Sequence, residues 1–248
     1  LVSLSEADDL VSSLFEYRFS SNGDLGGHTV GNLLLIALTE LNQNSFPKAI
    51  QEASKLLAVR GQIIPVSLQP TVLCAELTDG EIVRGESLIP ERKNREPIRH
   101  VFLEPRGNGS VTKVTAHRGA VTAIRQADAI IIGPGSLYTS IIPNFLAVGM
   151  IEALQESRAV KIFVCNVATQ DGETSGYDSS AHFQAFLEHA DITVNHVIVN
   201  SNVEQLPTEW MQAVVKPERP LGFLGKLVVG DVVDESMRTR HDSAKLAN

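Results

Sequence analysis

A short apolar run that leads straight into a glycine turn sets the fold class of this chain. Residues 129–132 read Ala-Ile-Ile-Ile, residues 133–136 read Gly-Pro-Gly-Ser, and a helical pattern begins near Leu137. A buried strand that passes through such a turn into a helix is typical of α/β proteins. Glycines let a ligand approach the backbone closely, and the first N–H groups and the dipole of a helix favour an anion. The run predicts a phosphate-binding turn, with an ordinary strand-to-helix corner as the alternative.

Five residues of this turn are candidate ligand groups. Gly133 and Gly135 would offer their backbone, and Ser136, Thr139 and Ser140 would offer hydroxyl donors. Hydroxyls and backbone N–H groups at a helix start are common partners of phosphate oxygens.

The second half of the chain alternates between helical and strand patterns. Val- and Ile-rich strands separated by helices indicate a mostly parallel sheet with helices on both faces. The predicted helices are 120–126, 146–156 and 181–188, and the predicted strands are 129–132, 161–165, 196–199 and 227–233. Asp242 or Ser243 is expected to cap a last helix.

The first half reads differently. A Ser5–Asp8 capping box predicts a helix through Leu14, Thr29 is the expected N-cap of a second, and a third is expected from Pro47 to about Val59. Strands are predicted at 62–66, 71–77, 81–84 and 98–103, with a hairpin turn at 79–80. We therefore expect one α/β domain over 1–248 with a small antiparallel, β-rich subregion at about 62–104.

Composition narrows the class of protein. The net charge of −8 argues against broad binding of nucleic acid, which needs a basic surface, but it allows one small anionic ligand. Cys74 and Cys165 lie in apolar strand-like runs and are predicted to be buried thiols, as in a reducing compartment. With no signal-peptide pattern and no apolar run of membrane-spanning length, a cytoplasmic location is expected.

A polar segment follows the predicted strand 161–165. Asn166, Thr169, Gln170 and Glu173 are side chains that hydrogen-bond sugars, amides and hydroxyls. If this strand neighbours strand 129–132, the segment lies beside the glycine turn at the carboxyl edge of the sheet, where open α/β sheets bind ligands. A polar loop without a ligand is the alternative.

Two more clusters are candidate sites. His28 stands at a helix start, where the helix dipole favours the neutral imidazole, and Asn32 interrupts an otherwise apolar helix. A capping histidine and a satisfied core asparagine are the alternatives. Near the C-terminus, Arg238 and Arg240 suit an anionic ligand or a neighbouring carboxylate, and a solvated terminus is equally consistent.

The common catalytic motifs are missing from the sequence. It contains no G-x-x-x-x-G-K-[ST], G-x-S-x-G, H-E-x-x-H or CxxC pattern, and no nucleophile–base pair is evident. No catalytic residue and no metal site can therefore be assigned from the residues, which indicate a phosphate or nucleotide binder of α/β type.

Several blocks resemble the bacterial gluconeogenesis factor family (YvcK-type, CofD-like), which is related to the 2-phospho-L-lactate transferases. They are G-G-H-T-V-G-N-L-L-L at 26–35, G-Q-I-I-P-V-S at 61–67, D-A-I-I-I-G-P-G-S-L-Y-T-S-I-I-P-N at 128–144, V-C-N-V-A-T-Q-D-G-E-T-S-G-Y at 164–177 and R-H-D-S at 240–243. The likeness spans nearly the whole chain in the family's order. Family members begin with a glycine-rich strand–turn–helix and an acidic segment that this sequence does not show. Either an N-terminal segment is missing from the sequence, as we expect, or the protein lacks that segment.

The resemblance implies a Rossmann-like fold and a nucleotide-sugar ligand, UDP-N-acetylglucosamine. It also implies a role in cell shape and cell-wall synthesis during gluconeogenic growth. By motif, Gly133, Gly135, Ser136 and Ser140 would lie at the phosphates. Asn166, Thr169 and Gln170 would line the same cleft, and Arg240 would approach from the C-terminal segment. Ser243 stands where many members have a threonine and is a candidate phosphosite.

Two functions are consistent with these residues and this resemblance. The first is a non-catalytic nucleotide-sugar sensor that acts through cell-wall regulatory proteins. The second is a Mg²⁺-dependent transferase that moves a phosphate-linked group from a nucleotide to a hydroxyl, for which Asp171 and Glu173 are the local carboxylates. The composition is compatible with a homodimer without requiring one.

Overall fold

The computed structural model describes residues 9–20, 23, 25–107, 112–207 and 210–248. They fall into two compact units, divided between Leu68 and Gln69. The capping box expected at Ser5 and Asp8 lies outside the described residues. Among the described residues, no helix is both long and apolar enough to cross a lipid bilayer.

The N-terminal unit is helical. Its helices are α1 (Asp9–Glu16), α2 (Val30–Leu41) and α3 (Phe46–Leu56), and α2 packs against the other two. The prediction for Thr29 is confirmed: its side chain accepts the N–H of Asn32 at 3.2 Å and caps α2. Helix α3 carries Pro47 in its first turn, where the missing N–H costs nothing.

The strand predicted at 62–66 is wrong. Residues 62–66 form no strand in the structure, and the chain runs irregularly to Pro70. Pro65 and Pro70 supply the physical reason, because proline has no N–H to donate to a strand ladder.

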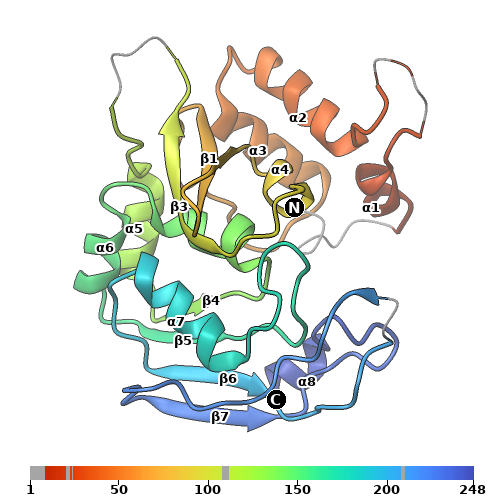
Figure 1. The fold of residues 1–248 in the computed structure, drawn as a ribbon. Coiled ribbons are helices and arrows are strands. Elements are labelled where there is room, and N and C mark those ends of the chain that lie inside the picture. The colour runs from red at the N-terminus through yellow and green to blue at the C-terminus, as the bar shows by residue number, and fades with distance from the viewer. Residues whose placement is uncertain (1–8, 21–22, 24, 108–111, 208–209) are drawn as a thin grey trace. The chain divides into compact units, whose positions relative to one another are not determined.

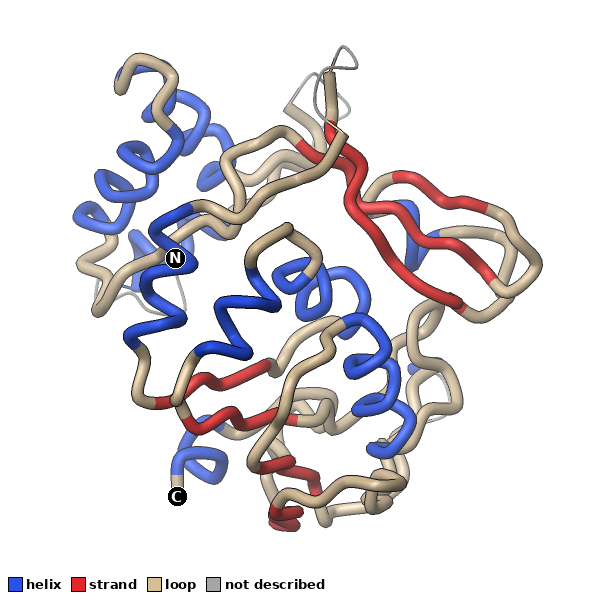
Figure 2. The backbone as a smooth tube through the Cα atoms, turned by 90° about the vertical axis from the view of Figure 1, so that its left-hand side faces the viewer, coloured by secondary structure: helices blue, strands red, loops and turns tan. Residues whose placement is uncertain are grey.

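The second unit begins with a small antiparallel sheet. Its strands are β1 (Thr71–Leu77), β2 (Ile82–Arg84) and β3 (Ile98–Pro105), in the order β2-β1-β3, with the short helix α4 (Leu88–Glu91) between the last two. The turn at Asp79 and Gly80 joins β1 to β2 as predicted, and Gly80 takes a φ of +89° there. Figure 2 shows these strands as a group separate from the parallel sheet.

The parallel sheet has the order β4-β5-β6-β7, so strands that follow one another in the chain are neighbours in space (Figure 1). The strands of this sheet and the helices around it are, in chain order, α5 (Arg118–Gln126), β4 (Ala129–Ile132), α6 (Met150–Glu156), β5 (Val160–Val164), α7 (Ser179–His189), β6 (His196–Asn200), β7 (Lys226–Gly230) and α8 (Ser243–Ala247). The predicted α/β, Rossmann-like, mostly parallel fold with a small antiparallel addition is confirmed. Strand β7 ends at Gly230, earlier than predicted.

Aromatic side chains build the core between the sheet and α7. Phe163 of β5 packs against Phe183 and Phe186 of α7, with ring centroids 5.3 and 5.1 Å apart. The opposite face of the sheet is less covered: Ile131 is 66% exposed and Val160 is 42% exposed. Cys74 and Cys165 are free and buried, as predicted, and burial raises the pKa of the Cys74 thiol to about 11.

The segment after the glycine turn is less regular than predicted. It contains a π-helical turn η2 (Leu137–Ile141) and a 3-10 turn η3 (Ile142–Phe145), and α6 begins at Met150 instead of residue 146. Pro143 cannot donate a backbone hydrogen bond and so prevents one continuous α-helix. Gly149, with a φ of +95°, then starts α6.

Candidate functional site

Gly133 lets β4 turn sharply beside β5. Its φ is +88°, and a Cβ there would stand 2.9 Å from the carbonyl oxygen of Val164 and 3.1 Å from Cδ1 of Ile141. Both the backbone conformation and the space therefore require glycine. Gly135 differs, because its φ is not positive and a Cβ would make ordinary 3.6 Å contacts with Ser140 and Ile141. The first glycine shapes the turn, and the second leaves it open.

Asn166 joins the loop after β5 to the glycine turn. Its Nδ2 donates to the carbonyl oxygen of Gly135 at 2.8 Å, and its Oδ1 accepts the N–H of Gly135 at 3.5 Å. Strands β4 and β5 pair in parallel, which places their carboxyl ends side by side. The predicted neighbourhood of the turn and the 165–174 loop is thus present in the structure.

A hollow of about 550 Å³ opens at this edge of the sheet. It is lined by Pro134, Gly135, Ser136, Asn166, Val167, Ala168, Thr169, Gln170, Gln212, Thr239, Arg240 and His241. Hydroxyl, amide, imidazole and guanidinium groups surround it, and none of the described residues that line it carries a carboxylate. With one guanidinium and many neutral hydrogen-bonding groups, the lining suits an anion that also bears polar groups.

The C-terminal segment brings Arg240 and His241 to the hollow. After β7 the chain folds back on itself, with a bridge between Val233 and His241 and a hydrogen bond from the N–H of Asp234 to the carbonyl of Arg240 at 3.0 Å. Val232 and Val233 are buried in a cluster with Val167, which anchors the segment beside the loop after β5.

Arg238 and Arg240 have different surroundings. Arg238 is mostly buried, pairs with Glu204 and donates to Oδ1 of Asn202 at 3.0 Å. Arg240 is exposed and lines the hollow. Of the two arginines considered from the sequence, Arg240 is therefore the one placed to meet a ligand.

His241 is held in one orientation. Its Nε2 donates to the carbonyl oxygen of Cys165 at 3.0 Å, and burial lowers the pKa of its imidazole. A neutral ring with its proton on Nε2 leaves Nδ1 as a hydrogen-bond acceptor. Nδ1 of His241 can accordingly accept a hydrogen bond from a hydroxyl or an amide N–H of a bound molecule.

Glu173 lies under the turn and bonds to the protein itself. Its carboxylate accepts the backbone N–H of Tyr138 at 3.1 Å, the hydroxyl of Thr139 at 2.8 Å and the amide of Gln170 at 3.0 Å. It is 5% exposed. The carboxylate of Glu173 thus binds the N–H of Tyr138, which is one of the helix-start N–H groups that were expected to bind an anion. Thr139 and Glu173 line no part of the hollow and act by holding η2.

The buried carboxylate of Glu173 makes stability depend on pH. Burial raises its pKa above the ordinary 4.5, against the lowering effect of its hydrogen bonds. The folded chain therefore holds this proton to higher pH than the unfolded chain, and the free energy of unfolding contributed by Glu173 falls as pH rises from 4.5 through the raised value. We expect the stability of the wild type relative to Glu173→Gln to decline over that window and then level off. Urea unfolding from about pH 4.5 to 8 measures this difference, and a difference that grew with pH would contradict the assignment.

Thr169 also has a structural role. Its N–H donates to the carbonyl of Ala213 at 2.8 Å, and its hydroxyl accepts the N–H of the same residue at 2.8 Å. These bonds tie the loop after β5 to residues 213–215 and bring Gln212 to the hollow.

The remaining candidates lie elsewhere. Gly133 and Ser140 belong to the turn but do not line the hollow. His28 and Asn32 lie in the N-terminal unit and line a separate hollow of about 630 Å³. Asn32 is exposed, so its amide does not bear the desolvation cost inferred from the sequence. Ser243 is exposed at the start of α8, which Asp242 caps as expected by accepting the N–H of Lys245 at 2.8 Å.

Sequence reasoning missed Gln212 and Thr239 and did not single out His241. Each comes from a segment far along the chain from the glycine turn, and neither Gln212 nor Thr239 stands in a pattern that signals a ligand. The R-H-D-S block at 240–243 was the one available signal for His241.

Comparison with known proteins gives consistent results. A family model described as "2-phospho-L-lactate transferase CofD" matches residues 1–220. A "Gluconeogenesis factor" of Halalkalibacterium halodurans is 40% identical over 100% of this chain and 77% of its own length. One of Bacillus subtilis is 39% identical over 100% of this chain and 79% of its own length. A crystal structure of a Bacillus halodurans protein superposes with a TM-score of 0.87 at 36% identity, covering 99% of this chain and 79% of that one.

Proposed function

The chain belongs to the CofD family, among the gluconeogenesis factors, and we propose that it is a regulatory protein that binds a nucleotide sugar of the UDP-N-acetylglucosamine kind. The observation that carries this proposal is one hollow that joins the open Gly135–Ser136 turn to the exposed guanidinium of Arg240. A volume of about 550 Å³ lies within the usual range of small-molecule sites.

The lining offers a distinct place for each part of such a ligand. A guanidinium binds phosphate oxygens through two parallel hydrogen bonds. We therefore assign the diphosphate to Arg240 together with Ser136. Gln170, Gln212 and Thr239 are neutral donors and acceptors that fit sugar hydroxyls and base edges. The role that we assign is to report the nucleotide sugar in the cytoplasm to proteins that govern cell shape and cell-wall synthesis.

A Mg²⁺-dependent transferase is the second candidate, because the matched family model carries the name of a transferase. Its local carboxylates are engaged elsewhere: Asp171 pairs with Arg95 at 3.3 Å, and Glu173 is buried under η2. This arrangement supports the binding role over transfer. Product formed from a nucleotide donor and Mg²⁺ by this chain would reverse that preference.

Thermal unfolding across a panel of nucleotides and nucleotide sugars tests the binding role. A ligand at about 100 times its dissociation constant stabilises the folded chain by about 2.7 kcal/mol. For a chain of this size, that corresponds to a rise in melting temperature of roughly 5–10 °C. We expect this rise with UDP-N-acetylglucosamine and a smaller one with uridine, which lacks the phosphates.

Gly135 provides the matched variants. Gly135→Ala should fold normally, because its Cβ makes only ordinary contacts, whereas Gly135→Leu should add bulk where the ligand meets the backbone. We expect the ligand-induced rise to persist in the alanine variant and to vanish in the leucine variant. Each variant's ligand-free melting temperature reports whether it has folded. If Gly135→Leu folds and the ligand still stabilises it as much as the wild type, the proposed binding site at the Gly135 turn is refuted.

A further inference from the structure

The turn at residues 170–174 brings Gln170 to the hollow and Glu173 under η2. It is closed by bonds of its own: the N–H groups of Glu173 and Thr174 donate to the carbonyl oxygen of Gln170 at 3.1 and 2.9 Å. The N–H of Gln170 donates to the hydroxyl of Thr174 at 2.9 Å, and its side-chain amide donates to Glu173 at 3.0 Å. A contact that fixes this turn therefore also fixes the side chain that lines the hollow.

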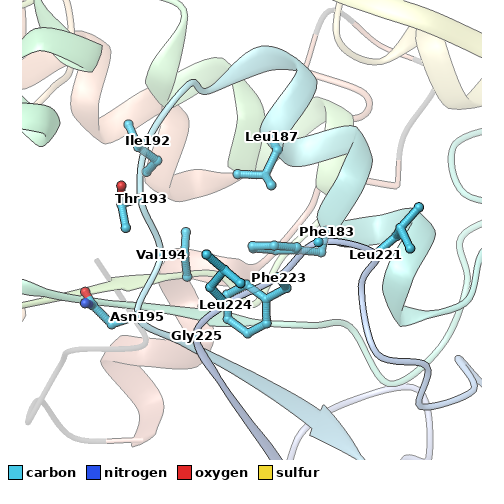
Figure 3. Close-up of a pocket in the computed structure, with 11 residues that line it drawn as sticks. Phe183, Leu187, Ile192, Thr193, Val194, Asn195, Leu221, Phe223, Leu224 and Gly225 are labelled. Atoms are coloured by element: carbon cyan, nitrogen blue, oxygen red, sulfur yellow. The ribbon is translucent and has the colours of Figure 1, made fainter.

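The chain on either side of the turn is anchored to the parallel sheet and its helix. Ahead of the turn, Ala168 forms a bridge with Val214. After it the chain enters α7, whose Phe183 packs edge-on against Phe223 with ring centroids 5.1 Å apart (Figure 3). The turn lies between these anchors, and its own support comes from another part of the fold.

That support is the α4 segment, residues 88–96, which comprises α4 and the chain that follows it between β2 and β3. The guanidinium of Arg92 donates to the carbonyl oxygen of Gly172 in the turn. It also donates to the carbonyl oxygens of Ile89 at 2.6 Å and Glu96 at 2.9 Å. Arg92 is 9% exposed, so one buried side chain ties the turn to both parts of the α4 segment.

Gly172 allows the close approach of the two segments. Its φ is +77°, and a Cβ there would stand 2.7 Å from Nη1 of Arg95 and closer still to the carbonyl oxygen of Pro90. Both the backbone conformation and the space therefore require glycine. Arg95 also pairs with Asp171 at 3.3 Å, but these two side chains are half exposed, and exposed pairs contribute little. The buried guanidinium of Arg92 is thus the main polar link.

The charge of Arg92 also acts on Glu173. Burial raises the pKa of the Glu173 carboxyl, and attraction to the Arg92 guanidinium lowers it. In return, burial lowers the pKa of the guanidinium, and attraction to Glu173 raises it. Arg92 therefore favours the ionised carboxylate, the form that accepts both the N–H of Tyr138 and the hydroxyl of Thr139.

We propose that Arg92 is a positioning residue for the ligand site, although it does not line the hollow. It holds the 170–174 turn through the carbonyl of Gly172, and the turn presents Gln170 to the ligand. The small antiparallel sheet, which carries the α4 segment between two of its strands, then serves as a support for the site. This inference rests on the nucleotide-sugar binding proposed above.

Titration calorimetry of the full chain with UDP-N-acetylglucosamine tests the positioning role. We expect Arg92→Met to raise the dissociation constant roughly 3- to 10-fold, as for the loss of one neutral hydrogen bond from Gln170. Arg92→Lys keeps the charge and a donor, so it should lose affinity in the same direction but by less. The ligand-free melting temperature of each variant reports whether it has folded, and Arg92→Lys carries the test if Arg92→Met does not fold.

Gly80→Ala controls for stability alone. It bears the cost of a side chain at positive φ on the turn between β1 and β2, but it leaves the contacts of Arg92 intact. We expect it to lower the melting temperature and to bind with the affinity of the wild type. Weakened binding by Gly80→Ala equal to that of Arg92→Met would assign the effect to stability and overturn the proposal.

A second measurement needs no ligand. The stability of the chain relative to its Glu173→Gln variant declines as pH rises through the pKa of Glu173. Removing the attraction of Arg92 raises that pKa further, so the decline should extend to higher pH when both proteins carry Arg92→Met. An unmoved pH window, or wild-type affinity in the folded Arg92 variants, would overturn this inference. A wild type that binds no nucleotide sugar would instead refute the proposed function.

Discussion

Gly133→Ala is expected to lower the free energy of unfolding by about 3 kcal/mol, because two costs add together. A non-glycine residue at a φ of +88° pays roughly 1–2 kcal/mol, and forcing an extra carbon into packed structure costs about 1–3 kcal/mol. The second cost is hard to relieve, because the Cβ would meet the backbone carbonyl of Val164 at 2.9 Å. Urea unfolding followed by circular dichroism measures the change.

Gly80→Ala is the matched control. Gly80 has a φ of +89°, and a Cβ there would meet nothing within 4 Å. The variant therefore bears the conformational cost without the collision and should lose only about 1–2 kcal/mol. Equal losses at the two positions would show that the carbonyl of Val164 does not restrict the turn and would contradict the tight approach of β4 and β5.

Arg240→Gln is expected to weaken the binding of UDP-N-acetylglucosamine by roughly 10- to 150-fold. A hydrogen bond to a charged group contributes about 1.5–3 kcal/mol, and each 1.4 kcal/mol is about a factor of ten in affinity. Glutamine keeps a polar side chain of moderate length but removes the charge and the paired donors. Because Arg240 is exposed, the stability of the free protein should change little. Titration calorimetry at fixed salt measures the affinity.

Two other substitutions separate the guanidinium from general charge effects. Arg240→Lys keeps the charge without the planar fork and should recover only part of the affinity. Arg99→Gln removes an exposed arginine that pairs with Glu76 on the antiparallel sheet and should leave the affinity unchanged. If Arg99→Gln weakened binding as much as Arg240→Gln, the effect would come from net charge and not from the hollow.

Local pattern was sufficient to place the turn and the loop beside it. An apolar run that ends in glycine predicted β4, and its boundaries, Ala129 and Ile132, match the structure. Because consecutive parallel strands usually pair, the loop after β5 was expected next to the turn, and Asn166 bonds to Gly135 there. The failures at 62–66 and near Leu146 follow from Pro65 and Pro143, which interrupt patterns that are otherwise regular.

The sequence could not predict which polar residues of the site face a ligand and which bond to other parts of the protein. Glu173 and Thr139 are 34 residues apart and both polar, so the sequence allows either to face a ligand or to face the other. The three-dimensional fold decides, because the buried carboxylate takes the hydroxyl and a backbone N–H that a ligand would otherwise bind. Gln212 and Thr239 reach the hollow only through the ladder of residues 213–215 and the fold-back after β7.

A crystal structure of the chain with UDP-N-acetylglucosamine tests the central claim most directly. We expect the diphosphate in the hollow at the carboxyl edge of the parallel sheet, with its oxygens within hydrogen-bonding distance of Ser136 and the guanidinium of Arg240. The sugar and base should meet Gln170, Gln212 or Thr239. A nucleotide sugar bound away from this hollow, with Arg240 still exposed to solvent, would contradict the account.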